Sequence, residues 1–272
     1  MKNKTRIFSK KGVKSGKRIR FLYATAFAVA YFFGISCQSG VFLAKSDSAI
    51  RERLASYTTY FNQNDGGRCE NIRLAASRLN GIALQPYGEL SFNAVVGART
   101  AKNGYKQAKV IVQGEFVEGI GGGVCQVSTT LYNAALLSGL TVVESYAHSL
   151  QVGYVPPSRD AMVTSRNDLR LYNPRKETVY ISSSVSAGSL RFTIYGKTNG
   201  RTYEIESREI EEIPPVEQLL APGEEFLRLP RSGLKSESYL KTYEKGVLVS
   251  IRRLRTDEYA PQKGVIRKKS ET

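Results

Sequence analysis

A cysteine that follows three glycines, and the only histidine of the chain, are the residues whose types and spacing could do chemistry. The run Gly121-Gly122-Gly123-Val124-Cys125-Gln126 opens a segment with helical character, and His148 lies 23 residues after Cys125. Free backbone N–H groups and the positive end of a helix both favour a thiolate at the first helical turn. A thiolate near an imidazole is the minimum equipment for nucleophilic catalysis.

Asp160 completes a candidate catalytic set in the order cysteine, histidine, carboxylate. In this interpretation Cys125 is the nucleophile, His148 is the base, and the carboxylate fixes the orientation of the imidazole. Asp160 lies 12 residues after His148, which leaves room for a strand of about six residues, a Pro-Pro turn and the start of another strand. Such a hairpin would bring Asp160 beside His148, whereas Asp168, the alternative carboxylate, lies eight residues further along.

Residues around the cysteine are candidates for supporting roles. Backbone N–H groups between Gly123 and Gln126 could hold a developing oxyanion. The Gln126 side chain could donate to that oxyanion or simply cap the helix. Ser128 and Tyr132 are secondary candidates, because helical spacing places them on the same face as Cys125.

Each candidate also has a purely structural interpretation. Cys125 could pack as a small apolar residue, or form a disulfide with Cys69 in an oxidising compartment. His148 could hydrogen-bond a buried backbone group, and Asp160 could stabilise a turn or pair with the neighbouring Arg159. The glycine run could bind a carboxylate or a phosphate at a helix N-terminus without any chemistry.

Other classes of site lack their sequence signatures. The segment 119–124 is missing the third glycine of a dinucleotide fingerprint, and no Gly-Lys-Ser/Thr follows it. With one histidine and isolated cysteines, the chain offers no zinc ligand set. We therefore expect neither a metal nor a cofactor.

The charge distribution and one apolar run predict a membrane anchor. Residues 1–20 form a basic tail with nine Lys/Arg and no acid, and residues 21–44 are almost entirely apolar. About 20 apolar residues span a bilayer, and positive charges stay in the cytoplasm. We expect an uncleaved signal anchor with the main domain outside the cytoplasm. A cleaved signal peptide is the alternative, but its small-residue cleavage pattern is poor here.

Beyond residue 45 the chain carries the signals of an α+β fold. We expect helices over residues 46–63, 70–80 and 125–138, the last ended by Gly139. Strands, separated by Gly, Pro or Asn, should then build a mainly antiparallel sheet. The expected strands are Thr141–Glu144, Leu150–Val155, Ala161–Thr164, Asp168–Tyr172, Thr178–Ser182 and Leu190–Tyr195. A cysteine-bearing helix followed by His and Asp on strands is the order of transglutaminase-like and papain-like sites.

This pattern divides the part after the anchor into three. We expect the α+β domain over residues 46–200, a linker over 201–215, where Ile213-Pro214-Pro215 occurs, and a small β module over 216–268. In that module two strands should flank Glu244-Lys245-Gly246 as a hairpin. The rest of the chain after residue 20 is only mildly basic, which suits anionic cell-wall polymer or lipid headgroups better than nucleic acid.

Several motifs resemble the VanW family, over about residues 55–196. The strongest is the run Gly121–Ala135, and the others are Asn71–Ala76, Ser91–Asn93, Val96–Thr100, Gly104–Ala108, His148-Ser149, Tyr154–Pro156, Arg159–Ala161 and Asp168-Leu169. The chain departs from the family pattern at the turn Pro86–Glu89 and at Glu144-Ser145. Residues 216–268 also resemble the five-glycine modules of cell-wall proteins, with four glycines in loose alignment.

The resemblance implies a bacterial envelope protein, linked to glycopeptide resistance by the family name, with one membrane segment. Together with the site residues it suggests a Cys-His(-Asp) hydrolase or acyl transferase that acts on peptidoglycan or another wall polymer. The competing hypothesis is a non-catalytic accessory protein that binds the wall or its precursors. The sequence does not specify the oligomeric state.

Overall fold

The computed structural model describes residues 41–43, 52–112 and 115–268. The basic tail 1–20 and most of the expected anchor lie outside these residues, while Val41–Leu43, at the end of the apolar run, form the short strand β1. Within the described ranges, no helix combines the length and the apolar character needed to cross a membrane.

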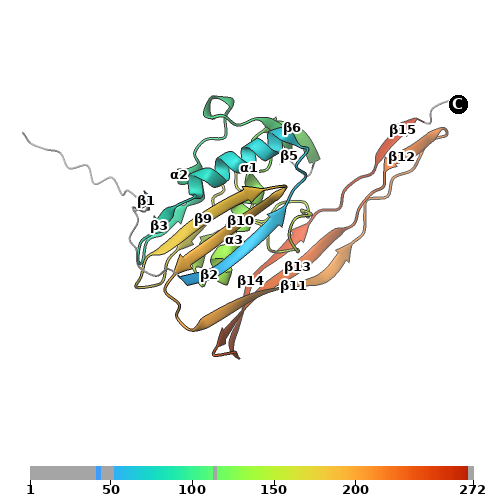
Figure 1. Ribbon diagram of the computed structural model, residues 1–272. Coiled ribbons are helices and arrows are strands. Elements are labelled where there is room, and N and C mark those ends of the chain that lie inside the picture. Colours follow the sequence, from blue (N-terminus) through green and yellow to red (C-terminus); the bar gives the residue numbers. More distant parts are fainter. Residues whose placement is uncertain (1–40, 44–51, 113–114, 269–272) are drawn as a thin grey trace, which may run out of the picture. The chain divides into compact units, whose positions relative to one another are not determined.

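The larger part of the fold is an antiparallel sheet with two helices packed on it (Figure 1). The sheet has five strands in the order β1-β3-β9-β10-β2. They are β1, β3 (Ile82–Leu84), β9 (Val179–Ser186), β10 (Ser189–Gly196) and β2 (Glu52–Tyr60). The helices are α1 (Gly66–Leu79) and α3 (Val124–Leu137), which contact the sheet and each other.

Smaller elements surround this core. A second antiparallel sheet has the order β4-β8-β7, and β5 and β6 form a hairpin that leads into α3. The bounds are β4 (Glu89–Ser91), β8 (Arg170–Tyr172), β7 (Thr141–Glu144), β5 (Gln107–Val112), β6 (Glu115–Ile120), α2 (Phe92–Val96) and the 3-10 turn η1 (Ala101–Asn103).

The chain ends in two further β-sheets. One has the order β11-β13-β14 and the other pairs β12 with β15. The bounds are β11 (Arg201–Ile213), β12 (Glu224–Arg228), β13 (Gly233–Glu244), β14 (Val247–Tyr259) and β15 (Val265–Lys268). The expected hairpin around residues 244–246 is confirmed, with Lys245 and Gly246 both at positive φ.

The predicted linker over residues 201–215 is wrong, because Arg201–Ile213 form β11 along the full length of β13. Ile205 of β11 and Leu240 of β13 belong to the same buried cluster as the helices, and Tyr203 packs against it. Gly139 at the end of α3 lies so close to Tyr203 that an added Cβ would stand 2.6 Å from its ring. The C-terminal sheet is therefore packed onto the α+β core.

The α+β expectation is confirmed in part, because strands predominate over helices in the described residues. The predicted helices over 70–80 and 125–138 correspond to α1 and α3. The helix predicted over 46–63 is wrong where the structure describes it, since Glu52–Tyr60 form β2, paired with β10. The β-branched and aromatic residues Tyr57 to Tyr60 favour an extended chain, and sheet pairing outweighs the helical spacing of its apolar residues.

The strands predicted over Leu150–Val155 and Ala161–Thr164 are also wrong. Apart from a single bridge between Tyr146 and Met162, residues 145–169 are irregular. Their apolar side chains alternate because they are buried against the core, not because they pair in a sheet. Polar groups of α3 satisfy part of this backbone: Ser128 donates to the Ala161 carbonyl, and Thr129 accepts from its N–H.

Asn71 joins α1 to the loop that carries the glycine run. Its side chain is fully buried and donates to the carbonyls of Lys106 and Gly122, both at 3.0 Å, while its Oδ1 accepts from the N–H of Lys106 at 2.8 Å. One amide therefore fixes the start of β5 and the middle of the glycine run, the two segments that set the entry into α3.

Asn71→Ala should lower the free energy of unfolding by about 2–3 kcal/mol, because it leaves buried backbone groups without partners. Urea denaturation of the purified protein measures this. Asn64→Ala is the matched control, since Asn64 is exposed and its side chain has no contact in the structure. Equal stabilities of the two variants would contradict the assigned role of Asn71.

Candidate active site

Cys125 lies in the first turn of α3, at the end of a glycine run that has steric reasons for its composition. Gly123 is the N-cap and has a φ of +101°, which a residue with a side chain rarely adopts. A Cβ on Gly122 would stand 2.5 Å from the carbonyl oxygen of Lys109 in β5. The run thus lets β5 approach the start of α3, whatever chemistry follows.

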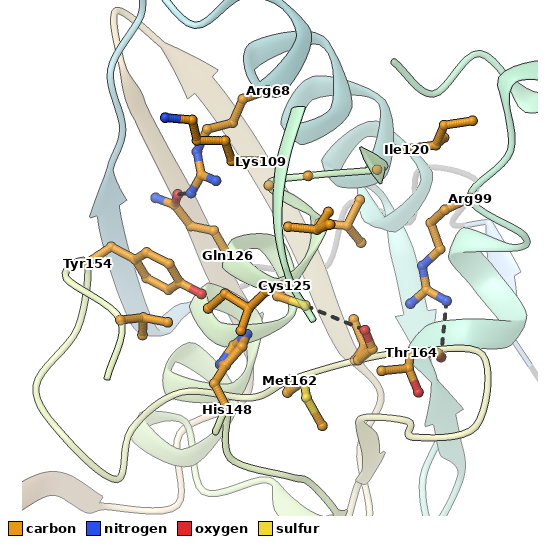
Figure 2. A pocket seen from close by; sticks show the side chains of 18 of the residues that line it. Arg68, Arg99, Lys109, Ile120, Cys125, Gln126, His148, Tyr154, Met162 and Thr164 are labelled. Carbon is orange, nitrogen blue, oxygen red and sulfur yellow. Dashed lines mark hydrogen bonds between the residues drawn. The ribbon is translucent and has the colours of Figure 1, made fainter. Parts of the chain in front are cut away.

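The Cys125 thiol is half-buried and is not part of a disulfide. Its sulfur lies 3.5 Å from the carbonyl oxygen of Val163 (Figure 2). Cys69 is also free and contacts the carbonyls of Asn62 and Gln63, at 3.4 Å each. The disulfide alternative between the two cysteines is therefore not realised in the structure.

The structure brings His148 and Asp160 together. The carboxylate Oδ2 lies 2.6 Å from Nδ1 of the imidazole and also accepts from the backbone N–H of His148 at 2.7 Å. Both side chains are buried. With Nδ1 held by the carboxylate, Nε2 is the ring nitrogen left to serve Cys125, beside which the ring lies in Figure 2. Neither residue is on a strand. An irregular loop, and not the expected hairpin, brings Asp160 beside His148.

The pKa shifts at this site favour a thiolate–imidazolium pair. Burial by itself raises the pKa of Cys125, but the hydrogen bond and charge of His148, with the nearby charge of Arg99, bring it below its usual value. Burial acts to lower the pKa of His148, but its hydrogen bonds to Asp160 and Cys125 raise it to about 9.

Asp160 has two further partners that the sequence did not suggest. Its Oδ1 accepts from Tyr259 Oη at 2.6 Å and from the Arg255 guanidinium at 2.8 Å, both on β14. The expected competitor Arg159 turns away, donates to Asn133 and lies over the Tyr57 ring. No local pattern marks Arg255 and Tyr259, because they lie about a hundred residues from Asp160 in the chain.

The alternative carboxylate and the secondary candidates lie elsewhere. Asp168 accepts from Ser91 Oγ and from the N–H of Asn93 at the start of α2, and does not contact His148. Ser128 binds the Ala161 carbonyl, and the buried Tyr132 lies under the Arg255 guanidinium. Ser128 therefore positions the loop, and Tyr132 packs in the core.

Of the predicted oxyanion donors, the Gln126 groups are already occupied. Its Nε2 donates to Thr59 Oγ1 and to the Tyr60 carbonyl, both at 2.9 Å, and its N–H donates to Gly123. Within the described residues, the N–H groups of Gly122, Gly123 and Cys125 have no acceptor. These three remain as donors for a developing oxyanion.

Cys125 and His148 line a cavity of about 820 Å³. Its wall combines the glycine run with Tyr154, Met162 and several polar groups (Figure 2). The phenol of Tyr154 is hydrogen-bonded to Thr129, and burial raises its pKa. The cavity is large enough for a ligand of several residues.

The pKa directions predict an unusual pH dependence for alkylation of Cys125 by iodoacetamide. Because its pKa is lowered, the ratio of the rate at pH 6 to that at pH 9 should exceed that of free cysteine. Asp160→Asn removes the group that raises the pKa of His148, so the thiolate loses support and the rate at pH 6 should fall about tenfold. Peptide mass spectrometry resolves Cys125 from the other cysteines.

Glu177→Gln is the control for that substitution, because Glu177 lies on the surface and pairs only with Lys197. It should leave the rate unchanged. A wild-type pH profile that matches that of free cysteine would contradict a thiolate–imidazolium pair at this site.

The chain is similar to known proteins over the part that carries Cys125, His148 and Asp160. Residues 67–195 match the family model described as VanW like protein. Over 188 residues the chain is 40% identical to the uncharacterized protein YoaR of Bacillus subtilis (strain 168), covering 64% of this chain and 62% of YoaR. It is 27% identical over 106 residues to the vancomycin B-type resistance protein VanW of Enterococcus faecalis (strain ATCC 700802 / V583), covering 39% and 38%.

The matched segment spans less than two thirds of the length of either of these relatives. Among solved structures, the IgA1 protease G5 domain aligns with 28% of this chain and 100% of its own, at 20% identity and a TM-score of 0.18. The family match includes the glycine run, Cys125, His148 and Asp160. Through residues 67–195, the chain is similar to the VanW-like family.

Proposed function

We propose that the VanW-like domain is a thiol-dependent enzyme that hydrolyses or transfers an acyl group of a cell-envelope polymer, with peptidoglycan as the leading substrate. One observation carries the proposal. A half-buried thiol at a helix N-terminus and an imidazole line a large cavity, and a buried carboxylate holds the far ring nitrogen of the imidazole. That is the arrangement that nucleophilic acyl transfer needs.

The steps follow from the geometry. The Cys125 thiolate attacks the carbonyl carbon of an amide or ester, a C–S bond forms, and the carbonyl oxygen becomes an oxyanion facing the free N–H groups. Collapse breaks the C–N or C–O bond, and the imidazolium of His148 gives its proton to the leaving amine or alcohol. Water or an acceptor amine then attacks the thioester and gives a proton to neutral His148, the C–S bond breaks, and the Cys125 thiolate and the imidazolium are restored.

The envelope setting rests on the relatives and on the N-terminal sequence. One similar protein is named for vancomycin resistance, and residues 67–195 match the VanW-like family model, which supports this setting. Residues 1–44 have the composition of a single-pass anchor with the N-terminus inside. A cysteine before His and Asp in the chain also matches transglutaminase-like order, although here His148 and Asp160 lie on irregular segments.

The second candidate is a non-catalytic protein that binds the wall or its precursors. The size of the cavity and its free N–H groups favour it. It needs no reactive sulfur, so the two candidates differ in what they require of Cys125.

Cys125→Ala decides between catalysis and binding. The full chain is incubated with purified peptidoglycan, and released or newly linked fragments are followed by mass spectrometry, as is an acyl adduct on the protein. Turnover should fall by about a thousandfold or more. Cys69→Ala, which removes a buried thiol outside the cavity, should retain it. Retention of peptidoglycan by both variants, without turnover or adduct in the wild type, would favour the binding protein.

The proposed topology is tested separately, in intact cells. A C-terminal tag should be removed by external protease if the main domain lies outside the membrane, because the positive charges of residues 1–20 hold the N-terminus inside. An N-terminal tag should stay protected until the cells are opened. Protection of the C-terminal tag in intact cells would show that the orientation is wrong.

A further inference from the structure

The cavity around Cys125 is lined by cations. Among the side chains that the structure describes, four basic ones from different parts of the chain line it, and no Asp or Glu does. They are Arg68 of α1, Arg99 before η1, Lys109 of β5 and Arg231 between β12 and β13. In the view of Figure 2, Arg68 and Lys109 lie to one side of Cys125, and Arg99 lies to the other.

The two half-buried arginines have no carboxylate partner. Arg99 donates to Asn93 Oδ1 at 2.6 Å and to the Thr164 carbonyl at 3.3 Å, which are both neutral. Arg68 donates to Gln126 Oε1 at 2.6 Å, which is also neutral. Neither forms a salt bridge within the described residues, although Arg255, nearby in the fold, pairs with both Asp160 and Asp257.

A guanidinium that is partly withdrawn from water and forms no salt bridge costs free energy, which an anion in the cavity would offset. Burial lowers the pKa of Arg99, whereas Cys125 and Asp168 raise it, and the group stays cationic at neutral pH. Arg99 lines the same cavity as Cys125, and its charge acts to lower the pKa of that thiol. Planar guanidinium groups hold carboxylate and phosphate oxygens through paired hydrogen bonds.

We propose that Arg99, supported by Arg68, Lys109 and Arg231, forms an anion subsite that selects substrates with a carboxylate or phosphate beside the bond that Cys125 attacks. This rests on the proposed function and narrows its substrate class. A free peptide carboxylate and a polymer phosphate share this chemistry, and the position of Arg99 restricts the anion to groups close to the acyl carbon.

Two alkylating reagents of similar size, one anionic and one neutral, test the subsite without a substrate. Iodoacetate is an anion and iodoacetamide is neutral, and with both the Cys125 thiolate forms a C–S bond as iodide leaves. The ratio of their rates at Cys125 cancels the fraction of thiolate, so a changed pKa of the thiol does not affect it. In the full chain this ratio should exceed that of free cysteine by about tenfold, and 0.5 M salt should reduce it.

Arg99→Gln should lower the ratio on the order of five-fold, and Arg99→Lys should largely keep it. Lys109→Gln, at an exposed position of β5, should lower the ratio less. Arg170→Gln is the matched control, because Arg170 is paired with Glu89 away from the cavity. A wild-type ratio equal to that of free cysteine, or one that Arg99→Gln and Lys109→Gln leave unchanged, would overturn the subsite.

Acetate and inorganic phosphate as protectants against iodoacetamide distinguish the two sources of the anion. Stronger protection by acetate indicates a peptide carboxylate, and stronger protection by phosphate indicates a phosphate-bearing polymer. A raised ratio in a protein without acyl-transfer activity would defeat the proposed function and leave the subsite standing. Acyl transfer by a protein whose rate ratio equals that of free cysteine would support the proposed function and overturn the subsite.

Discussion

The buried carboxylate of Asp160 is the interaction on which the rest of the site depends. It is 1% exposed and accepts four hydrogen bonds, from the backbone and ring of His148, from Tyr259 and from Arg255. A buried charge is tolerated only when it is paired and fully hydrogen-bonded. Burial acts to raise the pKa of Asp160, yet these partners lower it, so the group stays ionised beside the imidazole.

This carboxylate also explains why the C-terminal sheet packs onto the VanW-like core. Tyr259 accepts from the N–H of Ser158 at 2.7 Å while it donates to Asp160, and Ser236 bonds Ser158 through their hydroxyls at 2.7 Å. The sheet thereby satisfies an irregular loop that has no strand partner. We infer that β14 contributes to the site by holding the orienting carboxylate in place.

Local sequence patterns predicted the parts of this structure that local physics decides. Glycine geometry and helical spacing located α3 and Cys125, and the single histidine pointed to its partner. Asp160 also lies beside His148, as expected, but an irregular loop and not a hairpin brings it there. Burial of Leu150, Val152 and Val163 produces the same alternation as a strand, and sequence alone does not separate the two.

Contacts between residues far apart in the chain could not be predicted from local sequence patterns. Arg255 and Tyr259 lie on a strand whose sequence shows only alternation, and the linker prediction for residues 201–215 hid the sheet that carries them to the site. The lining of the cavity is similar, because Arg68, Arg99 and Arg231 come from separate elements and meet only in the fold. Gln126 shows the reverse case: its position beside Cys125 suggested an oxyanion donor, whereas its amide is already bound to β2.

The central claim is that the imidazole of His148 is held as a cation between a thiolate and a carboxylate. His148 is the only histidine of the chain, so NMR of its ring nitrogens in the untagged full-length protein gives one unambiguous set of signals. The ring should titrate at about 9, and Cys125→Ala should move the titration to lower pH, because one of the groups that raise the pKa of His148 is lost. A titration near the ordinary value of about 6.5, unchanged in Cys125→Ala, would contradict it.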